Sequence, residues 1–356
     1  MTITTPRFEL AHMAHAELYT PDLEGSLWFF TQLLGMRETA RHQGSVYLRC
    51  YEDPYHHSLK LTERDEPGLG TVGWRTTSAE ALERRASALD KAGLGQGWTK
   101  GDLGVGRTFA FQSPDGHSME LVWDVEKYSA PDDLRSRILT RRSKRPLQGL
   151  PPRRLDHVNL MASDVTTQKE LFEQTLGFST RERVVDAASG GTEIGAWMSV
   201  NALGHEMAVM RDQTGAKGRL HHLAFWYGVP QHNNDAAELC REYGIQIEAG
   251  PDVHGITQGA FLYVFEPGGN RIELFGNSGI LQFEPDHETV TWDLSDFDTG
   301  LAIGGATLPA ETYFVYGTPA LDNQTKLLAG WKDRGVVRRP TGLAPVGSNN
   351  RVSPHQ

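Results

Sequence analysis

Two segments of the chain carry apolar residues at a helical spacing, with polar residues between them. They are residues 26–34 and 168–176. A recurrence near 3.6 residues is typical of an amphipathic α-helix. Gly35 and Gly177 follow directly, and glycine commonly ends a helix because it adopts a left-handed backbone without strain. We therefore predict a helix in each segment, ended by its glycine.

Shorter apolar and aromatic runs occur at residues 222–227 and 260–265, bounded by turn residues. Runs of this length that are rich in aromatic residues predict strands. Residues 266–270 contain a proline and two glycines, which is typical of a turn joining two strands. Residues 79–92 and 235–243 predict a second helix in each half of the chain.

The two halves of the sequence repeat one another. Residues 14–35 align with residues 156–177 without a gap, and both segments end in Leu-Gly. Residues 113–121 align with residues 266–274, and both end in Glu-Leu. The second half contains additional residues between its two matches. A repeat of this kind indicates a duplicated module.

This repeat sets the expected domain organisation. Residues 1–138 form the first module and residues 154–300 the second, with a linker over residues 139–153 and a C-terminal extension over residues 301–356. The linker mixes Arg and Lys with Pro and Gly, a composition that suits neither a helix nor a central strand. We predict an α+β fold of two tandem modules, each with a mainly antiparallel sheet.

Three residues of the second module suit a divalent metal. His157, His222 and Glu273 occupy separate expected strands, and two histidines with one carboxylate form a facial triad that leaves adjacent metal positions open. His221 precedes His222 directly, and because side chains alternate along a strand, only one of the pair can point at the metal. Alignment with His157 selects His222, so we expect His221 to face away.

The first module provides an internal comparison. Its equivalents of the three candidate ligands are His15, Gly73 and Glu120. Glycine has no side chain with which to bind a metal, so this module lacks one third of the triad. We expect the first module to be structural, without an intact metal site.

The doubled strand-helix-strands unit with His157, His222 and Glu273 resembles the vicinal oxygen chelate superfamily. Within it, the chain is similar to the type I extradiol ring-cleaving dioxygenases, most of all to the catechol 2,3-dioxygenase group. The resemblance spans about residues 8–295, and its most specific part comprises residues 254–257, Tyr263, residues 267–271 and Glu273.

The resemblance implies a function. It implies that Fe(II), held by the triad, binds a catechol and O2, and that the ring is opened beside the two hydroxyls to a 2-hydroxymuconic semialdehyde. His205, His254 and Tyr263 match positions of catalytic groups in that family, with His205 as an acid and the other two as groups that orient and polarise the substrate oxygen. Trp197 and Phe261 are candidates for an aromatic substrate pocket.

The resemblance also extends to enzymes that cleave 3,4-dihydroxyphenylacetate, which need a cation for the substrate carboxylate. Near His254 the sequence has Glu248, Ala249 and Asp252, and no arginine. This favours an uncharged ring, either catechol or a substituted catechol. Cleavage of 3,4-dihydroxyphenylacetate or of a bicyclic catechol stays an alternative, as does Mn(II) in place of Fe(II), since the same ligands accept both metals.

Two other function classes stay open. A glyoxalase-type isomerase shares the fold, but it distributes its metal ligands over two modules, which Gly73 and the complete second triad argue against. A non-catalytic binding module would not need His157, His222 and Glu273 together.

Composition and local sequence bear on the partners of the protein, its location in the cell and the state of its cysteines. The formal charge of −10 at pH 7 argues against a nucleic-acid partner. No apolar run approaches the roughly 18 residues of a membrane span, and residues 1–7 lack the profile of a secretory signal, so we expect a cytoplasmic protein. Cys50 and Cys240 are expected to be reduced structural thiols. Kinship with the family implies a homo-oligomer, most often a tetramer.

Overall fold

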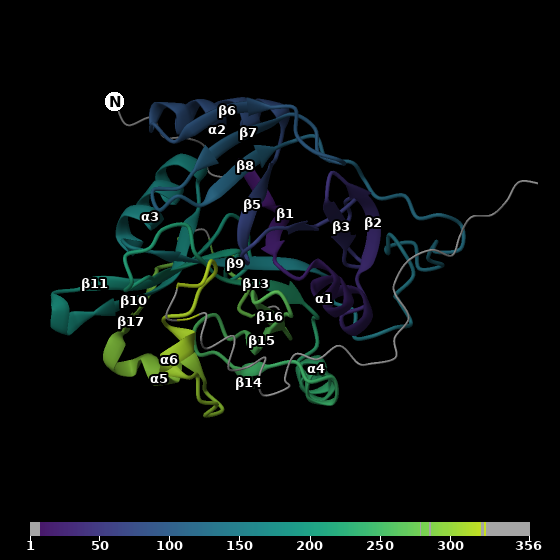
Figure 1. The fold of residues 1–356 in the computed structure, drawn as a ribbon. Coiled ribbons are helices and arrows are strands. Elements are labelled where there is room, and N and C mark those ends of the chain that lie inside the picture. The colour runs from purple at the N-terminus through teal and green to yellow at the C-terminus, as the bar shows by residue number, and fades with distance from the viewer. Residues whose placement is uncertain (1–7, 278, 285, 322–323, 325–356) are drawn as a thin grey trace, which may run out of the picture.

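The computed structural model describes residues 8–277, 279–284, 286–321 and 324. Its strands form two mixed sheets, one from each half of the chain, which occupy the upper and lower parts of Figure 1. The first sheet contains β1 (Leu10–Thr20), β2 (Arg37–His42), β3 (Ser45–Arg49), β4 (Leu59–Glu63), β5 (Gly68–Thr76), β6 (Gly95–Thr99), β7 (Thr108–Gln112) and β8 (Ser118–Val122). The second sheet contains β9 (Arg154–Ala162), β10 (Ser179–Asp186), β11 (Thr192–Ser199), β12 (Met207–Arg211), β13 (Leu220–Trp226), β14 (Ile247–Val253), β15 (Ala260–Phe265), β16 (Arg271–Phe275) and β17 (Val290–Asp293).

The two sheets have the same topology. The first has the order β2-β3-β4-β1-β5-β8-β7-β6, and the second, followed from its β17 edge, reads β17-β10-β11-β12-β9-β13-β16-β15-β14. The entering strands β1 and β9 are each central, parallel to β4 or β12 and antiparallel to β5 or β13. The predicted duplication and the α+β class are confirmed, and β17 is an addition to the second sheet.

Helices cover the sheets and join their strands. They are α1 (Leu23–Trp28), α2 (Ala79–Lys91), α3 (Val165–Leu171), α4 (Gln231–Glu242), α5 (Phe297–Leu301) and α6 (Ala310–Tyr313), with π-helical segments η1 (Phe29–Leu33) and η2 (Phe172–Leu176) and 3₁₀ segments η3 (Ala187–Ser189) and η4 (Leu294–Asp296). The two helices expected at 79–92 and 235–243 correspond to α2 and α4.

The helices expected at residues 26–34 and 168–176 each begin about one turn earlier and finish in a π-helical turn. They begin earlier because Asp22 and Asp164 cap them, accepting hydrogen bonds from backbone N–H groups of the first turn. The spacing of apolar residues over a single turn does not distinguish α from π geometry.

Both predicted terminal glycines have left-handed backbones. The φ angle is +60° at Gly35 and +78° at Gly177, a region that residues with a Cβ atom rarely adopt. Each glycine turns the chain into the next strand, β2 or β10, so the two halves continue in the same way.

One hydrophobic core joins the two modules. Trp74 of the first sheet meets Phe178 edge-to-face with ring centroids 5.0 Å apart, and Phe30 contacts Phe225 at 5.8 Å. Such aromatic contacts add to the stabilisation that comes from burying the rings. The modules therefore pack directly against each other, although the exact division of the chain into domains stays a prediction.

The linker and the extension both lie against folded parts of the chain. In the linker, the Leu150 N–H donates to the Leu33 carbonyl at 2.8 Å. In the extension, α5 lies beside β17 (Figure 1), and Tyr313 of α6 contacts Tyr263 of β15 with ring centroids 5.2 Å apart. Residues 322–323 and 325–356, which the predicted extension includes, fall outside the described residues.

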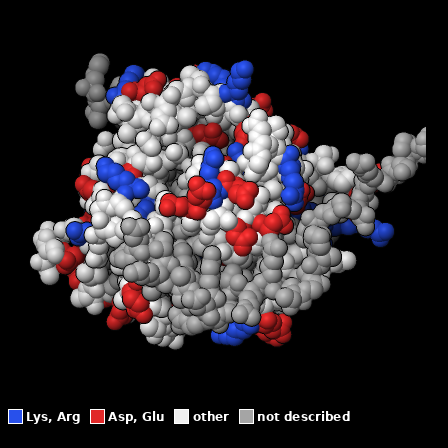
Figure 2. Space-filling model, viewed as in Figure 1, with Lys and Arg blue, Asp and Glu red and all other residues white. Residues whose placement is uncertain are grey.

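Charged side chains of both signs are interspersed over the face of the molecule in Figure 2. No helix among the described residues is long and apolar enough to cross a membrane. Cys50 and Cys240 are buried and unpaired, as the sequence predicted, and burial raises the pKa of both thiols.

Candidate metal centre

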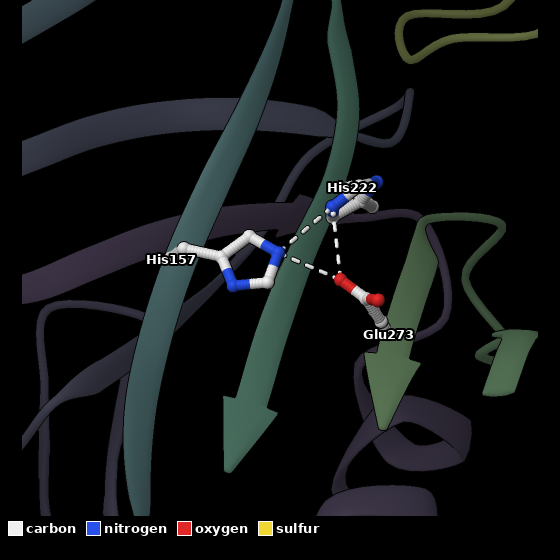
Figure 3. Close-up of side chains that lie close together, drawn as sticks. All are labelled: His157, His222 and Glu273. Carbon is white, nitrogen blue, oxygen red and sulfur yellow. Dashed lines mark hydrogen bonds and ion pairs between the residues drawn. The ribbon is translucent and has the colours of Figure 1, made fainter. Parts of the chain in front are cut away.

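The three candidate ligands lie on three neighbouring strands in the middle of the second sheet. The order β16-β13-β9 brings Glu273, His222 and His157 side by side. All three side chains are buried, and Figure 3 shows them pointing toward one common point. The strand pairing thus assembles residues that are far apart in sequence.

The distances between the ligand atoms fit a divalent cation. Glu273 Oε2 lies 2.6 Å from His157 Nε2 and 3.2 Å from His222 Nε2, and the two ring nitrogens are 3.2 Å apart. Two ligand atoms, each about 2.1 Å from a metal and at right angles to each other, would be about 3 Å apart. Among the described residues, this is the group of three metal-binding side chains whose ligand atoms converge.

The charges at the site are tightly coupled. Burial opposes a proton on His157, but the Glu273 and Asp156 carboxylates together outweigh burial and raise the pKa of His157 to about 9. Burial lowers the pKa of His222 to about 4. Burial opposes the charge of Glu273 as well, yet the facing His157 holds the pKa of this carboxyl well below its usual range. A cation held by these residues near neutral pH would therefore have to displace a proton from His157.

Asp156 orients the first ligand. Its carboxylate accepts a hydrogen bond from His157 Nδ1 at 2.9 Å and pairs with Arg154 at 2.8 Å. A carboxylate that accepts from one ring nitrogen leaves the other nitrogen to bind the metal and fixes the orientation of the ring.

His221 is not among the side chains that converge on the common point, as expected, but its ring contacts that of His222, with centroids 4.9 Å apart. The two Nδ1 atoms are 2.7 Å apart. The pairing of β13 with β9 shifts register between Leu220 and His222, and such a β-bulge interrupts the alternation of side chains. Burial holds the pKa of His221 well below its usual range, so its ring is neutral.

The three predicted catalytic residues surround the triad. The ring of His205 lies beside that of His157, with centroids 4.1 Å apart. The Tyr263 hydroxyl and His254 Nε2 are 2.9 Å apart, and His254 Nε2 lies 3.8 Å from Glu273 Oε1. Burial lowers the pKa of His205 and raises the pKa of Tyr263, so both are uncharged near neutral pH.

These residues line one cavity over the triad. Trp197 is among its lining residues, as predicted, but Phe261 is not. Phe261 instead stacks on the ring of His254, with centroids 3.9 Å apart and planes 13° from parallel. Its role as a wall of the substrate pocket stays a prediction, and in this structure its ring faces that of His254. No Lys or Arg of the described residues lines the cavity.

The C-terminal extension also contributes to the cavity, which the sequence did not predict. Leu301 and Tyr313 line it, and the Tyr313 hydroxyl donates to the Tyr263 hydroxyl at 3.2 Å. Tyr313 lies beyond both repeats, so alignment of the modules gave no signal for it. Helix α6 brings Tyr313 to the site through ring contacts with His221 of β13 and Tyr263 of β15.

The first module retains part of the same arrangement. His15 Nε2 lies 2.7 Å from Glu120 Oε1, and the backbone of Gly73 lies between them in the strand register. A Cβ atom at Gly73 would lie only 2.1 Å from His15 Cε1. His57, which precedes β4 as His205 precedes β12, has its ring centroid 5.7 Å from that of His15.

Residues 12–121 and 154–274 match the Glyoxalase/Bleomycin resistance protein/Dioxygenase superfamily. The chain belongs to this superfamily. A metapyrocatechase of Geobacillus stearothermophilus is 48% identical over 318 residues, which cover 88% of this chain and 95% of the relative. A manganese-dependent 2,3-dihydroxybiphenyl 1,2-dioxygenase of Geobacillus genomosp. 3 is 37% identical, over 82% of this chain and 93% of that protein.

The solved structure of the 2,3-dioxygenase LapB from Pseudomonas sp. KL28 superposes with a TM-score of 0.73 at 27% identity, covering 82% of this chain and all of that one. The resemblance of the sequence to the extradiol ring-cleaving dioxygenases is thereby confirmed. The likeness covers both modules, so the whole two-module architecture is shared with these enzymes.

Proposed function

We propose that this extradiol dioxygenase opens the ring of catechol, or of a catechol with an uncharged substituent, to a 2-hydroxymuconic semialdehyde. The observation that carries the proposal is the convergence of His157, His222 and Glu273 in a buried cavity that His205, His254 and Tyr263 also line. The identity of 48% with a metapyrocatechase supports it.

We propose His157, His222 and Glu273 as the ligands of a divalent metal, Fe(II) in the first place. When bound, such a cation would favour loss of a proton from a catechol hydroxyl and would supply the binding site for dioxygen. The residues themselves hold one negative charge at Glu273 and one neutral ring at His222. Their burial excludes bulk water, which strengthens each of these electrostatic interactions.

His205 is the proposed acid and base. Its ring is neutral near pH 7 because burial lowers its pKa, so it can accept a proton from the substrate and return it later. Its place beside His157 puts it over the open side of the triad. Nearby groups that develop negative charge would be stabilised when His205 carries that proton.

Tyr263 and His254 are proposed to orient the substrate oxygen. The Tyr263 hydroxyl lies within hydrogen-bond distance of His254 and close to the triad. On substrate binding, this hydroxyl can donate to a substrate oxygen instead, while Phe261 keeps the ring of His254 in place by stacking. Trp197, which lines the same cavity, is proposed as the aromatic wall for the substrate ring.

The lining of the cavity favours an uncharged substrate. A carboxylate substituent would need a cation, and the described lining residues provide no Lys or Arg. Cleavage of 3,4-dihydroxyphenylacetate is therefore the less favoured alternative. A bicyclic catechol stays a candidate because a relative acts, by its name, on 2,3-dihydroxybiphenyl with manganese.

Oxygen uptake by the anaerobically purified protein tests the function and the metal together. Metal-free protein is loaded with Fe(II) or with Mn(II), and catechol is then added. We expect stoichiometric uptake and a yellow semialdehyde, identified by absorbance and mass, with Fe(II). Oxygen uptake by the Mn(II)-loaded protein alone would change the proposed metal from Fe(II) to Mn(II). If neither loaded protein takes up oxygen with any uncharged catechol, the proposed reaction is refuted.

We further propose that the protein is a cytoplasmic homo-oligomer, a tetramer in the first place. The support is its family, in which homo-oligomers are common. Light scattering on the purified protein measures the mass directly. A mass close to the 39.5 kDa of one chain would refute the proposed assembly.

A further inference from the structure

The C-terminal extension reaches the metal centre at two backbone carbonyls and one hydroxyl. The carbonyl of Tyr313 lies 2.7 Å from His221 Nε2, and the carbonyl of Leu301 bonds His254 Nδ1. The Tyr313 hydroxyl bonds Tyr263. Each of these contacts ends on a residue of the proposed site or on the histidine beside it, so the extension interacts with both sides of the triad.

We propose that the two carbonyls set the tautomers of His222 and His254, which makes His221 a positioning residue for a metal ligand. The inference rests on the proposed function only in taking His222 as a ligand and His254 as a substrate-side group. It assigns to the extension a role that neither module can supply by itself.

The first chain of hydrogen bonds runs from α6 to the metal ligand. A carbonyl oxygen only accepts, so His221 Nε2 must carry the proton that is shared with Tyr313. With its proton on Nε2, His221 presents an unprotonated Nδ1, which is an acceptor. His222 Nδ1, at 2.7 Å from it, must then be the donor. This leaves the lone pair of His222 Nε2 directed at the common point of the triad.

The second chain follows the same logic on the substrate side. The carbonyl of Leu301 only accepts, so His254 Nδ1 carries the proton and His254 Nε2 accepts from the Tyr263 hydroxyl. The Tyr263 oxygen accepts in turn from the Tyr313 hydroxyl. This single placement of protons gives every donor and acceptor in this chain of hydrogen bonds a partner.

The extension is fixed firmly enough to impose these assignments. Arg271 is buried and pairs with Glu248 at 2.5 Å, and its guanidinium donates to the carbonyls of Thr312 at 3.2 Å and Tyr316 at 3.1 Å. Leu220 and Thr318 exchange backbone hydrogen bonds of 2.8 and 2.9 Å. Bonds of this kind on both sides of Tyr313 hold its carbonyl over His221.

The test compares three variants of the full-length chain by their affinity for Zn(II), measured in competition with a chromophoric chelator. His221→Phe keeps a ring but removes both hydrogen bonds, so we expect the affinity to fall by about 10- to 100-fold, as for other partners of metal-binding histidines. His221→Gln restores an amide donor for Tyr313 and a carbonyl acceptor for His222, and should recover most of the affinity.

His117→Phe is the matched control. His117 is buried, and its Nε2 lies 3.1 Å from the carbonyl of Arg219, the residue before β13, while none of its hydrogen bonds reaches the triad. Its substitution should leave the Zn(II) affinity unchanged. An affinity of His221→Phe equal to that of the unmodified protein, or a His221→Gln variant as weak as His221→Phe, would overturn the proposal.

A second measurement does not depend on the folding of any variant. In the Zn(II)-loaded, unmodified protein with ¹⁵N-labelled histidine, long-range NMR correlations report which nitrogen of each ring carries the proton. We expect the proton on Nε2 of His221 and on Nδ1 of both His222 and His254. The opposite tautomer at His221 would refute the inference. Because neither measurement uses catechol, an inactive protein with the expected tautomers would refute the proposed reaction alone.

Discussion

The two modules share one topology but differ in what they place at the centre of the sheet. In the second module, the central strands carry His157, His222 and Glu273, whereas in the first they carry His15, Gly73 and Glu120. In both modules the histidine and the carboxylate lie within hydrogen-bond distance, at 2.7 Å in the first and 2.6 Å in the second, but only in the second does a further histidine join them. The comparison teaches that the fold supplies the positions and that a single side chain decides whether a triad exists.

The modules also differ in what covers them. The extension packs on the second module, where Tyr313 and Leu301 reach the cavity, while in the first module a Cβ at Gly73 already has no room beside His15. The lined cavity and the complete triad thus occur together in the second module. Each prediction below alters one side of this comparison.

The largest effect is expected for His222→Ala, which leaves the second module with two of its three ligands, as in the first module. Loss of a residue that only orients a metal ligand lowers metal affinity by about 10- to 100-fold. Loss of the ligand itself should lower the affinity by more than this, and activity should fall below detection. Metal analysis and oxygen uptake measure both, with circular dichroism to establish folding.

His15→Ala is the control for that experiment, because it alters the equivalent position of the first module. It should leave metal content and turnover unchanged. Full activity in folded His222→Ala would contradict the ligand assignment.

His205→Gln should keep metal and substrate binding but lower kcat by about 10²- to 10⁴-fold, the usual contribution of a general acid or base. The measurement is steady-state oxygen uptake with catechol. His57→Gln changes the counterpart of His205 in the first module and should not affect kcat. An unchanged kcat in His205→Gln would remove His205 from the catalytic set.

Metal affinity should depend on pH in the second module. The pKa of His157 is raised to about 9, so below that pH the metal must displace one proton, and above it none. The dissociation constant for Zn(II) should therefore fall about tenfold for each pH unit between pH 6 and 8 and level off above about 9. A constant that does not vary between pH 6 and 8 would show that His157 is neutral in the metal-free protein.

The smallest effect is expected for Gly73→His, which places the missing histidine in the first module. Its Cβ would collide with the ring of His15, so we expect a loss of about 1–3 kcal/mol in unfolding free energy, typical of overpacking, and no second metal site. Urea denaturation and metal analysis measure the two quantities. A second equivalent of tightly bound metal would show that the missing histidine is all that prevents the first module from binding a metal.

Local patterns were sufficient for much of the fold. The strand expected at residues 260–265 is β15, and the glycines expected to end two helices have left-handed backbones. Periodicity and glycine act over a few residues, so the sequence expresses them directly. The π-helical turns and the added strand β17 were not predicted, because they depend on packing between segments that are distant in sequence.

The sequence by itself determined which residue types are present at equivalent points of the repeat, and hence that one module has a candidate triad and the other does not. Only the tertiary structure decided how neighbouring side chains are turned. A bulge brings His221 onto His222, stacking turns Phe261 onto His254, and α6 carries Tyr313 to the cavity. These outcomes depend on strand register and on contacts between distant segments, which no local pattern of residues specifies.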